Sequence, residues 1–366
     1  MHSQKQFYQA LLIVGVISIG LWPSRARAQQ GGYSPPELGG LFWGEAVPSS
    51  PGRHFLRTQI TNDVRWTIVY VPTNRSVTPA PLVLALHGGG HSAGKMESDH
   101  PNLIAAASEM GVVLAFPNGH EDIGGAQTWV AFGPVHIDRG YLEGVILWLQ
   151  HYLPIDTKRT FMTGFSAGAG MTQRFAADRP NRIKAGAAFC YSSGLVVATN
   201  GGRAELPTPE APISMFLVRG GLDEAVPPDG ITVTDKGFIC DSVADHMEFW
   251  VTAAGGTTND LMRTDVDATT TRFTYSGGTA LVEMTYDRSL GHRWETERDR
   301  PVLNWLLSLP TDATLRREGT NVVVTFASGI LQSADRVTGA WSDVSGATSP
   351  HLTPLAGSAR FFRTRR

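Results

Sequence analysis

One serine in this sequence has a spacing that could make it a nucleophile. Ser166 is the centre of residues 164–168 (GFSAG), a G-x-S-x-G pattern that follows an apolar run and precedes a helical pattern. A strand that turns sharply into a helix presents a serine hydroxyl at a helix N-terminus, where it can attack a carbonyl carbon. Glycine and serine are also common in ordinary turns, so the surrounding sequence has to decide between the two interpretations.

A serine nucleophile needs a base, and the base needs a carboxylate that orients it. Asp223 follows an apolar strand pattern in a turn-rich loop, and an open parallel sheet places its active site at such strand ends. The alternative is a solvated loop aspartate. His292 follows another strand pattern, whereas the competing base His246 lies inside a helix pattern, where a histidine is more often structural. We predict Ser166 as nucleophile, Asp223 as orienting acid and His292 as base.

A glycine-rich turn could supply the donors that stabilise an oxyanion. Residues 87–90 (HGGG) follow an apolar run, and we predict the backbone N–H groups of Gly88, Gly89 and Ala167 as the oxyanion hole. His87, His91 and His100 could instead suggest a metal site. The three glycines between the first two argue against one helical face, so no metal is predicted. Trp129 and Trp294 are candidate substrate contacts.

The elements around these residues alternate between strand and helix patterns. The chain has 366 residues, of which 42% are hydrophobic, enough for a large core. Short apolar strands separated by helices predict an α/β fold with a mostly parallel sheet and helices on both faces. Strands are expected at 64–71, 81–86, 112–116, up to 165, 184–189, 213–218 and 281–286, with a hairpin turn at 276–278; helices are expected at 103–110, 139–152, 242–254 and 301–309.

The ends of the chain differ in composition from its centre. Lys5, an apolar run over 10–22 and Ala26-Arg27-Ala28 predict a signal peptide over 1–28, and the run is too short to favour an uncleaved membrane anchor. We expect a Gly- and Pro-rich extended leader at 29–52, a catalytic domain at 53–310 and a small β module at 311–366. The mature protein is then secreted and independent of a membrane. A net charge of −2 without a basic block does not favour nucleic acid as partner.

The chain has two cysteines, Cys190 and Cys240. Export would permit a disulfide between them. Cys190 ends an apolar run, however, where a cysteine is often a small buried hydrophobe, so both interpretations stay open.

With these motifs in place, the chain resembles the secreted esterase group of α/β-hydrolases that includes polyhydroxybutyrate depolymerase-like proteins and feruloyl or acetylxylan esterases. The resemblance covers about 65–309, through VRWTIVYVP, LALHGGG, IDRGYLEGVILWL, LPIDTKRTFMTGFSAGAGMT, GGLDEAVP, LGHRW and VLNWLLSL. It implies a serine esterase that forms an acyl-enzyme, needs no cofactor and acts on an ester substrate that can be polymeric. Feruloyl or acetyl esters of plant polysaccharides are the first expectation, and polyhydroxyalkanoate or another polyester is the second.

The sequence departs from that group at several positions. Arg219 stands where many relatives have histidine, Ala167 and Ala169 where several have Asn and Gly, and Glu295 where proline is usual. These departures leave the substrate open. Asp138 matches an aspartate that the group places near the site, although an acid at a helix start is equally explained as a cap.

An alternative function belongs to another class. The chain could be a non-catalytic carbohydrate-binding protein on a hydrolase scaffold, in which the C-terminal module binds the carbohydrate. That module resembles small β modules appended to secreted bacterial proteins. The intact set of serine, aspartate and histidine argues against this class, because a binder has no need of all three. A peptidase of the same fold usually carries a large gating domain, which this length does not accommodate.

Overall fold

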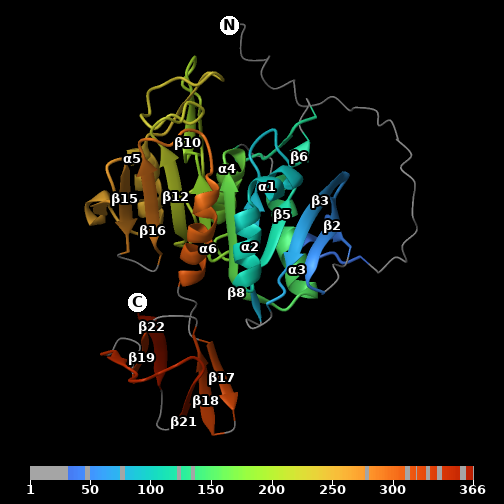
Figure 1. Ribbon diagram of the computed structural model, residues 1–366, viewed down its shortest axis with the longest axis vertical. Helices are drawn as coiled ribbons and strands as arrows, with labels where there is room; N and C mark the ends of the chain where they lie inside the picture. Colours follow the sequence, from blue (N-terminus) through green and yellow to red (C-terminus); the bar gives the residue numbers. More distant parts are fainter. Residues whose placement is uncertain are drawn as a thin grey trace. The chain divides into compact units, whose positions relative to one another are not determined.

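The structure is a computed structural model that describes residues 32–45, 50–74, 79–121, 125–132, 137–276, 280–309, 314–318, 320–326, 330–335, 340–354 and 360–365. The predicted signal peptide lies outside the described residues, as do the start of the leader, the boundary at 310–311 and the tip of the expected hairpin. Figure 1 shows one large sheet with helices on both sides and, after it in the chain, a group of C-terminal strands.

The main sheet has eleven strands, and its central six, from β5 to β16, run parallel. In spatial order the strands are β1 (Phe42–Gly44), β2 (Gly52–Ile60), β3 (Asp63–Val71), β5 (Val113–Pro117), β4 (Ala80–Leu86), β8 (Ile155–Phe165), β9 (Ala185–Phe189), β12 (Ser214–Gly220), β16 (Val282–Asp287), β15 (Thr270–Tyr275) and β14 (Met262–Asp265). Every residue of β4, β5 and β9 is buried, as expected for parallel strands covered on both faces.

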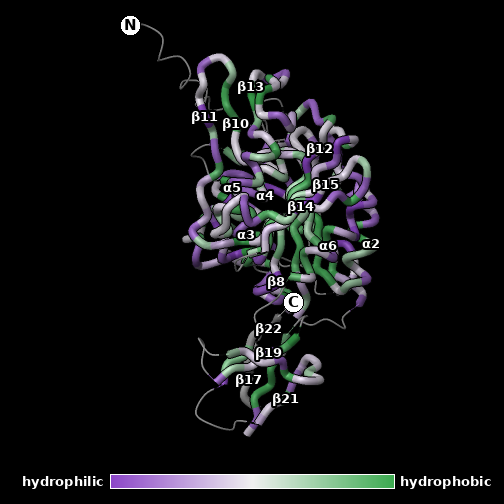
Figure 2. The backbone as a smooth tube through the Cα atoms, turned by 90° about the vertical axis from the view of Figure 1, so that its left-hand side faces the viewer, coloured by the Kyte–Doolittle hydropathy of each residue, from purple (hydrophilic) through white to green (hydrophobic). Residues whose placement is uncertain are grey.

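Helices cover the sheet in two layers. One hydrophobic cluster joins the sheet to α3 (Ile137–Tyr152), α4 (Ala167–Asp178) and α5 (Val243–Ala253). A second cluster joins the other face to α1 (Ala93–Asp99), α2 (Pro101–Glu109) and α6 (Asp299–Ser308). Figure 2 shows hydrophobic residues concentrated in the interior strands and polar residues in the surface loops. The predicted α/β-hydrolase class, with helices on both faces, is confirmed.

The predicted leader differs from the structure in its last part. Residues 42–44 are not a free extended segment, because they form β1, which pairs antiparallel with β2 at the edge of the sheet. Phe42 is completely buried and packs so closely on α3 that a Cβ at Gly144 would lie 2.1 Å from its ring. The compact domain therefore begins before residue 53, and the glycines and prolines around this short strand hid it from the sequence pattern.

Three smaller groups of strands complete the fold. The strands β6 (His120–Glu121) and β7 (Gln127–Thr128) form a hairpin, and β10 (Gly194–Val197), β11 (Arg203–Glu205) and β13 (Phe238–Cys240) form an antiparallel sheet. The C-terminal region contains two three-stranded sheets, built from β17 (Thr314–Glu318), β18 (Asn321–Thr325), β19 (Ile330–Ala334), β20 (Ser342–Asp343), β21 (His351–Pro354) and β22 (Phe361–Arg365). Its own small core contains Val324, Phe326 and Leu331.

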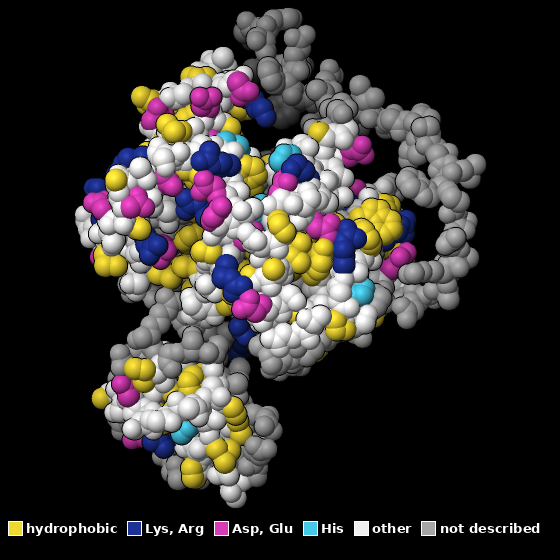
Figure 3. All heavy atoms as spheres, in the orientation of Figure 1, with side chains coloured by type: hydrophobic (Ala, Val, Ile, Leu, Met, Phe, Trp, Pro, Cys, Tyr) yellow, Lys and Arg dark blue, Asp and Glu magenta, His cyan; other side chains and the backbone are white. Residues whose placement is uncertain are grey.

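The surface of the described chain mixes charges of both signs. On the face shown in Figure 3, Lys and Arg side chains are interspersed with Asp and Glu over the large domain. Among the described residues, no helix combines the length and the hydropathy that crossing a bilayer requires.

Candidate active site

Ser166 lies in a strained turn between β8 and α4. Its backbone has φ 50° and ψ −121°, which is unusual for a residue with a side chain. A Cβ at Gly164 would lie 2.4 Å from the carbonyl oxygen of Gly168, and a Cβ at Gly168 would lie 2.4 Å from that of His87. The two glycines are therefore required by the close crossing of β8, α4 and the end of β4, which supports the turn interpretation of the G-x-S-x-G spacing.

The side chains of Ser166, His292 and Asp223 form one continuous hydrogen-bonded chain. The Nε2 atom of His292 lies 2.9 Å from Ser166 Oγ, and its Nδ1 atom lies 2.9 Å from each carboxylate oxygen of Asp223. Asp223 is almost fully buried, and its Oδ1 accepts the backbone N–H groups of Ala225 (3.0 Å) and Val226 (2.7 Å). This arrangement orients the imidazole toward the serine hydroxyl, as a general base requires.

Backbone contacts hold the loop of Asp223 against the loop of His292. The two loops follow β12 and β16, which are parallel neighbours, and the N–H of Leu222 donates to the carbonyl of Leu290 at 2.9 Å. A Cβ at Gly220 would lie 2.3 Å from that same carbonyl oxygen, so the close approach needs glycine there. The Gly-Gly pair before Asp223 thus fixes the acid relative to the base.

A pocket of about 490 Å³ opens beside Ser166 and His292. Its wall includes Gly89 and Ala167, the first residue of α4, whose N–H group has no acceptor within the helix. Gly88 lies directly behind, since a Cβ there would be 3.5 Å from the Cβ of Ser166. These three predicted oxyanion residues lie beside the serine. The rest of the lining consists of polar, aromatic and aliphatic residues: Thr128, Trp129, Tyr191, Leu195, Ala225, Val226, Thr234, Asp235, Lys236, Phe238 and Cys240.

The predicted contact Trp129 lines this pocket and also supports the glycine turn. Its Nε1–H donates to the carbonyl of His87 at 2.9 Å, and the N–H of Gly90 donates to the carbonyl of Gln127 at 2.8 Å. His87 Nε2 accepts the N–H of Gly119 at 2.8 Å, and burial lowers the pKa of His87 to about 4. His87 is therefore neutral at physiological pH and fastens the turn to the neighbouring loop.

Trp294 does not line the pocket, so its prediction as a substrate contact is not supported. Its ring is buried and stacks on Phe189 with centroids 4.0 Å apart and planes 7° apart, and its other neighbour is His100 at 4.5 Å. An aromatic residue two positions after a candidate base fits either the pocket or the core. Here the side chain anchors the loop of His292 in the core.

The histidines of the alternative metal interpretation do not converge. His87 bonds to the backbone, His91 lines a separate polar pocket, and His100 Nδ1 lies 2.8 Å from Asp299 in the core. A different group, Cys190 with Asp223 and His292, has potential ligand atoms within 4.8 Å of one another. Burial raises the pKa of the Cys190 thiol to about 12, so it stays protonated and is a poor ligand.

The two cysteines do not form the disulfide that export would have permitted. Both are free and buried, and Cys190 Sγ lies 3.3 Å from the carbonyl oxygen of Arg293. Cys240 lines the pocket, and burial raises the pKa of its thiol to about 11. The structure agrees with the interpretation of Cys190 as a small buried hydrophobe.

The competing base His246 lies in the core and makes no hydrogen bond to Ser166. Its Nε2 lies 2.6 Å from Gln173 Oε1 and its Nδ1 lies 3.3 Å from Arg219. Asp138, the other ambiguous residue, is buried, with an ion pair to Arg65 at 2.5 Å and a 2.7 Å hydrogen bond from the N–H of Val130. It therefore holds the loop that carries Trp129.

Sequence reasoning missed the wall of the pocket opposite Ser166. Tyr191 and Leu195 come from the segment after β9, and Lys236 and Phe238 come from the turn into β13. These segments show no clear periodicity, and their position after strands β9 and β12 was the one signal that could have found them.

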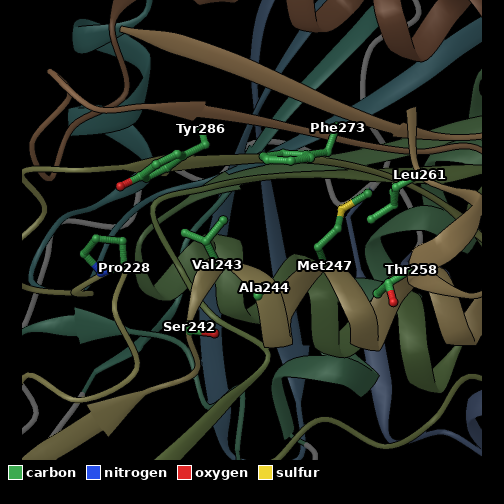
Figure 4. A pocket seen from close by; sticks show the side chains of 9 residues that line it. All are labelled: Pro228, Ser242, Val243, Ala244, Met247, Thr258, Leu261, Phe273 and Tyr286. Atoms are coloured by element: carbon green, nitrogen blue, oxygen red, sulfur yellow. The ribbon is translucent and has the colours of Figure 1, made fainter. Parts of the chain in front are cut away.

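A second pocket, of about 450 Å³, contains none of the predicted site residues. It lies between α5 and the strands β15 and β16, and Figure 4 shows Phe273 and Tyr286 facing Val243 and Met247 across it. Its lining carries no charged side chain. The pocket beside Ser166 is therefore the stronger candidate for a reaction site.

The topology and the position of the serine turn define an α/β-hydrolase fold. A solved structure of the complex of a pOPH variant with DMSO matches with a TM-score of 0.50 over 71% of this chain and 86% of that chain, at 14% identity. This likeness concerns the fold alone.

In sequence, the chain is related to esterases. It is 31% identical over 158 residues to the bifunctional acetylxylan esterase/xylanase of Neocallimastix patriciarum, covering 43% of this chain and 21% of that protein. It is 29% identical over 150 residues to feruloyl esterase B of Thermothelomyces thermophilus, covering 39% and 48%. The chain thus spans less than half of the length of these relatives, and no family model matches it.

Proposed function

We propose that this protein is a serine carboxylic-ester hydrolase that works through an acyl-enzyme. The observation that carries the proposal is the hydrogen-bonded chain from Asp223 through His292 to Ser166, with 2.9 Å at each step. A serine held in a strained turn beside the start of a helix has no evident structural need for this arrangement.

In the proposed reaction Ser166 Oγ attacks the carbonyl carbon of the ester while His292 Nε2 accepts its proton. Asp223 keeps the proton of Nδ1 in place and stabilises the imidazolium. The N–H groups of Ala167 and of the turn at Gly88 and Gly89 donate to the oxyanion. The imidazolium then protonates the leaving alcohol, and water, activated by the same histidine, releases the acid and restores the serine.

We propose feruloyl or acetyl esters of plant polysaccharides as substrates, because the names of the relatives point to these acyl groups. The pocket supports this choice, since Trp129, Tyr191 and Phe238 offer rings for an aromatic or small acyl group. Lys236 and Asp235 at its exposed side could bind polar groups of the alcohol. A polyester remains the alternative substrate, and hydrolysis rates distinguish the two.

We further propose that the protein is exported and then acts outside the cytoplasm, with residues 1–28 as signal peptide. The catalytic domain in this proposal extends from no later than Phe42 to about residue 310, and the β module follows. The N-terminal sequence of the exported protein tests the cleavage, because it should begin at Gln29. A retained N-terminus would contradict it.

The central experiment compares variants of the three site residues on a small para-nitrophenyl ester. We expect Ser166→Ala and His292→Ala each to lose on the order of a million-fold in turnover, because the members act as a unit, and Asp223→Asn to lose less. Circular dichroism checks that the variants fold. Retention of more than a few per cent of activity by folded Ser166→Ala would refute the assignment.

The substrate is tested with methyl ferulate, acetylated xylan and a polyester emulsion in parallel. We expect the enzyme to hydrolyse methyl ferulate or acetylated xylan faster than the polyester. The measured quantity is kcat/KM for the soluble ester and the amount of acid released for the polymers. Preferential release of acid from the polyester would favour the alternative.

A further inference from the structure

Arg219, at the end of β12, is an arginine in an unusual environment. Its side chain is completely buried, and among the described residues no carboxylate forms an ion pair with it. The guanidinium instead donates to backbone carbonyls, at 2.9 Å to Pro227 and 3.4 Å to Val226 and Asp241, and to His246 Nδ1 at 3.3 Å. Its Nε atom has no hydrogen-bond partner. A buried cation of this kind is costly, which calls for an explanation of its role.

The carbonyl contacts of Arg219 hold the turn that carries Asp223. The N–H of Val226 donates to Asp223 Oδ1 at 2.7 Å, while the carbonyl of the same residue accepts from Arg219. The next carbonyl, of Pro227, makes the shortest contact to the guanidinium. The turn is thus fixed from both sides, by the carboxylate on one and by the guanidinium on the other.

A second set of contacts connects Arg219 with the helix of the nucleophile. Since His246 Nδ1 accepts from Arg219, the proton of the neutral ring lies on Nε2, which donates to Gln173 Oε1 at 2.6 Å. Burial and the charge of Arg219 lower the pKa of His246 well below its ordinary value, so the ring stays neutral. Gln173 lies on α4, the helix that begins directly after Ser166. The hydrogen bonds therefore connect the turn of Asp223 with the helix that begins after Ser166.

The charge of Arg219 is balanced by few groups. Arginine keeps its proton inside proteins, and the neighbouring thiols of Cys190 and Cys240 are neutral because burial raises their pKa values to about 12 and about 11. Of the two nearby carboxylates, Asp241 pairs with Arg203 at 3.2 Å. The buried Asp223 is the other.

We propose that Arg219 is a positioning residue of the esterase site, which holds the Asp223 turn through its guanidinium fork. This inference rests on the proposed function. A fixed turn keeps the carboxylate of Asp223 on His292 Nδ1, which orients the base toward Ser166.

The role of the fork is tested by Arg219→Lys, which keeps a positive charge and loses the planar fork, and by Arg219→Met, which loses both. The readout is kcat and KM on para-nitrophenyl acetate, with kcat expressed per active serine counted with a fluorophosphonate label, so that the fraction of folded enzyme does not enter. We expect kcat to fall roughly tenfold to hundredfold in both variants as the acid turn loosens, with KM little changed.

A matched control is Arg174→Met, which removes a mostly buried arginine of α4 that pairs with Asp178 at 2.7 Å, away from the Asp223 turn. It should lower stability and leave kcat per active serine close to that of the unmodified protein. If Arg219→Met does not fold, Arg219→Gln replaces it as the neutral variant. A kcat per active serine that is unchanged in both Arg219→Lys and the neutral variant, or that Arg174→Met reduces equally, would overturn the inference. The proposed function itself fails only through Ser166→Ala, so the two failures are distinguishable.

Discussion

At the residue scale, the candidate site depends on side chains whose ionisation is set by burial. Burial keeps His87 and His246 neutral and both thiols protonated, whereas His292 is partly exposed beside the pocket. The strained backbone of Ser166 costs of order 1–3 kcal/mol, which the packing of β8 and α4 has to offset. Three histidines thus have different roles because their environments differ. His87 and His246 are structural, and His292 is the accessible candidate base.

The first prediction concerns His87 and the dependence of protein stability on pH. Its pKa of about 4 in the folded protein lies below the ordinary value of 6.5, so the unfolded chain binds more protons between these values. Stability should therefore fall as the pH drops from about 6.5 to about 4, by about 3 kcal/mol from this residue. Urea unfolding at pH 7 and pH 4.5 measures the loss.

The variant His87→Gln provides the comparison, because it cannot titrate. His246 has a lowered pKa too and contributes in the same direction, but it is present in both proteins and cancels in the difference. The variant should start less stable and lose less on acidification. An equal loss in both proteins would mean that His87 is not responsible.

At the element scale, the sequence predicted the strands and helices that have a strong pattern. The buried strands β4, β5 and β9 are continuous apolar runs, and α5 begins with a capping box of Ser242 and Asp245. The three candidate catalytic residues were found because each lies in the turn that follows a strand: Ser166 after β8, Asp223 after β12 and His292 after β16. The three-residue β1 and the pocket wall from β10 and β13 were not found, because their short lengths carry no period and tertiary contacts determine their conformation.

The second prediction concerns Gly168, which lies where β4, β8 and α4 cross closely. Gly168→Ala should destabilise the protein by at least about 3 kcal/mol, because the added Cβ would lie 2.4 Å and 2.5 Å from carbonyl oxygens of His87 and Leu86, which cannot move independently. Thermal or urea unfolding measures the change.

A matched glycine on another helix provides the control. A Cβ added at Gly94 of α1 would have only the Ser92 hydroxyl nearby, at 3.8 Å, so Gly94→Ala should be neutral or raise stability slightly. If the two substitutions had the same effect, the close crossing would not be the reason for the glycine at position 168.

At the scale of the whole molecule, the chain contains cores of very different size. Two large clusters cover the faces of the main sheet with buried residues between Phe42 and Leu309. The C-terminal strands have a core of only a few residues around Val324, Phe326 and Leu331. Every residue of the candidate site lies in this part of the chain, between Phe42 and Leu309. The small core predicts that the module contributes little to the stability of the hydrolase domain.

The last prediction concerns removal of the C-terminal module. A chain that ends at Pro310 should fold, and it should hydrolyse a small soluble ester with kcat/KM within a few-fold of the full protein, because Gly88, Ser166, Asp223 and His292 and both large cores precede the cut. Circular dichroism and ester hydrolysis measure the two properties. Any contribution of the module should appear instead as weaker retention on an insoluble polymer such as acetylated xylan. A truncated protein that is folded but inactive on the small ester would make the module part of the catalytic unit, because the candidate site would then be incomplete without it.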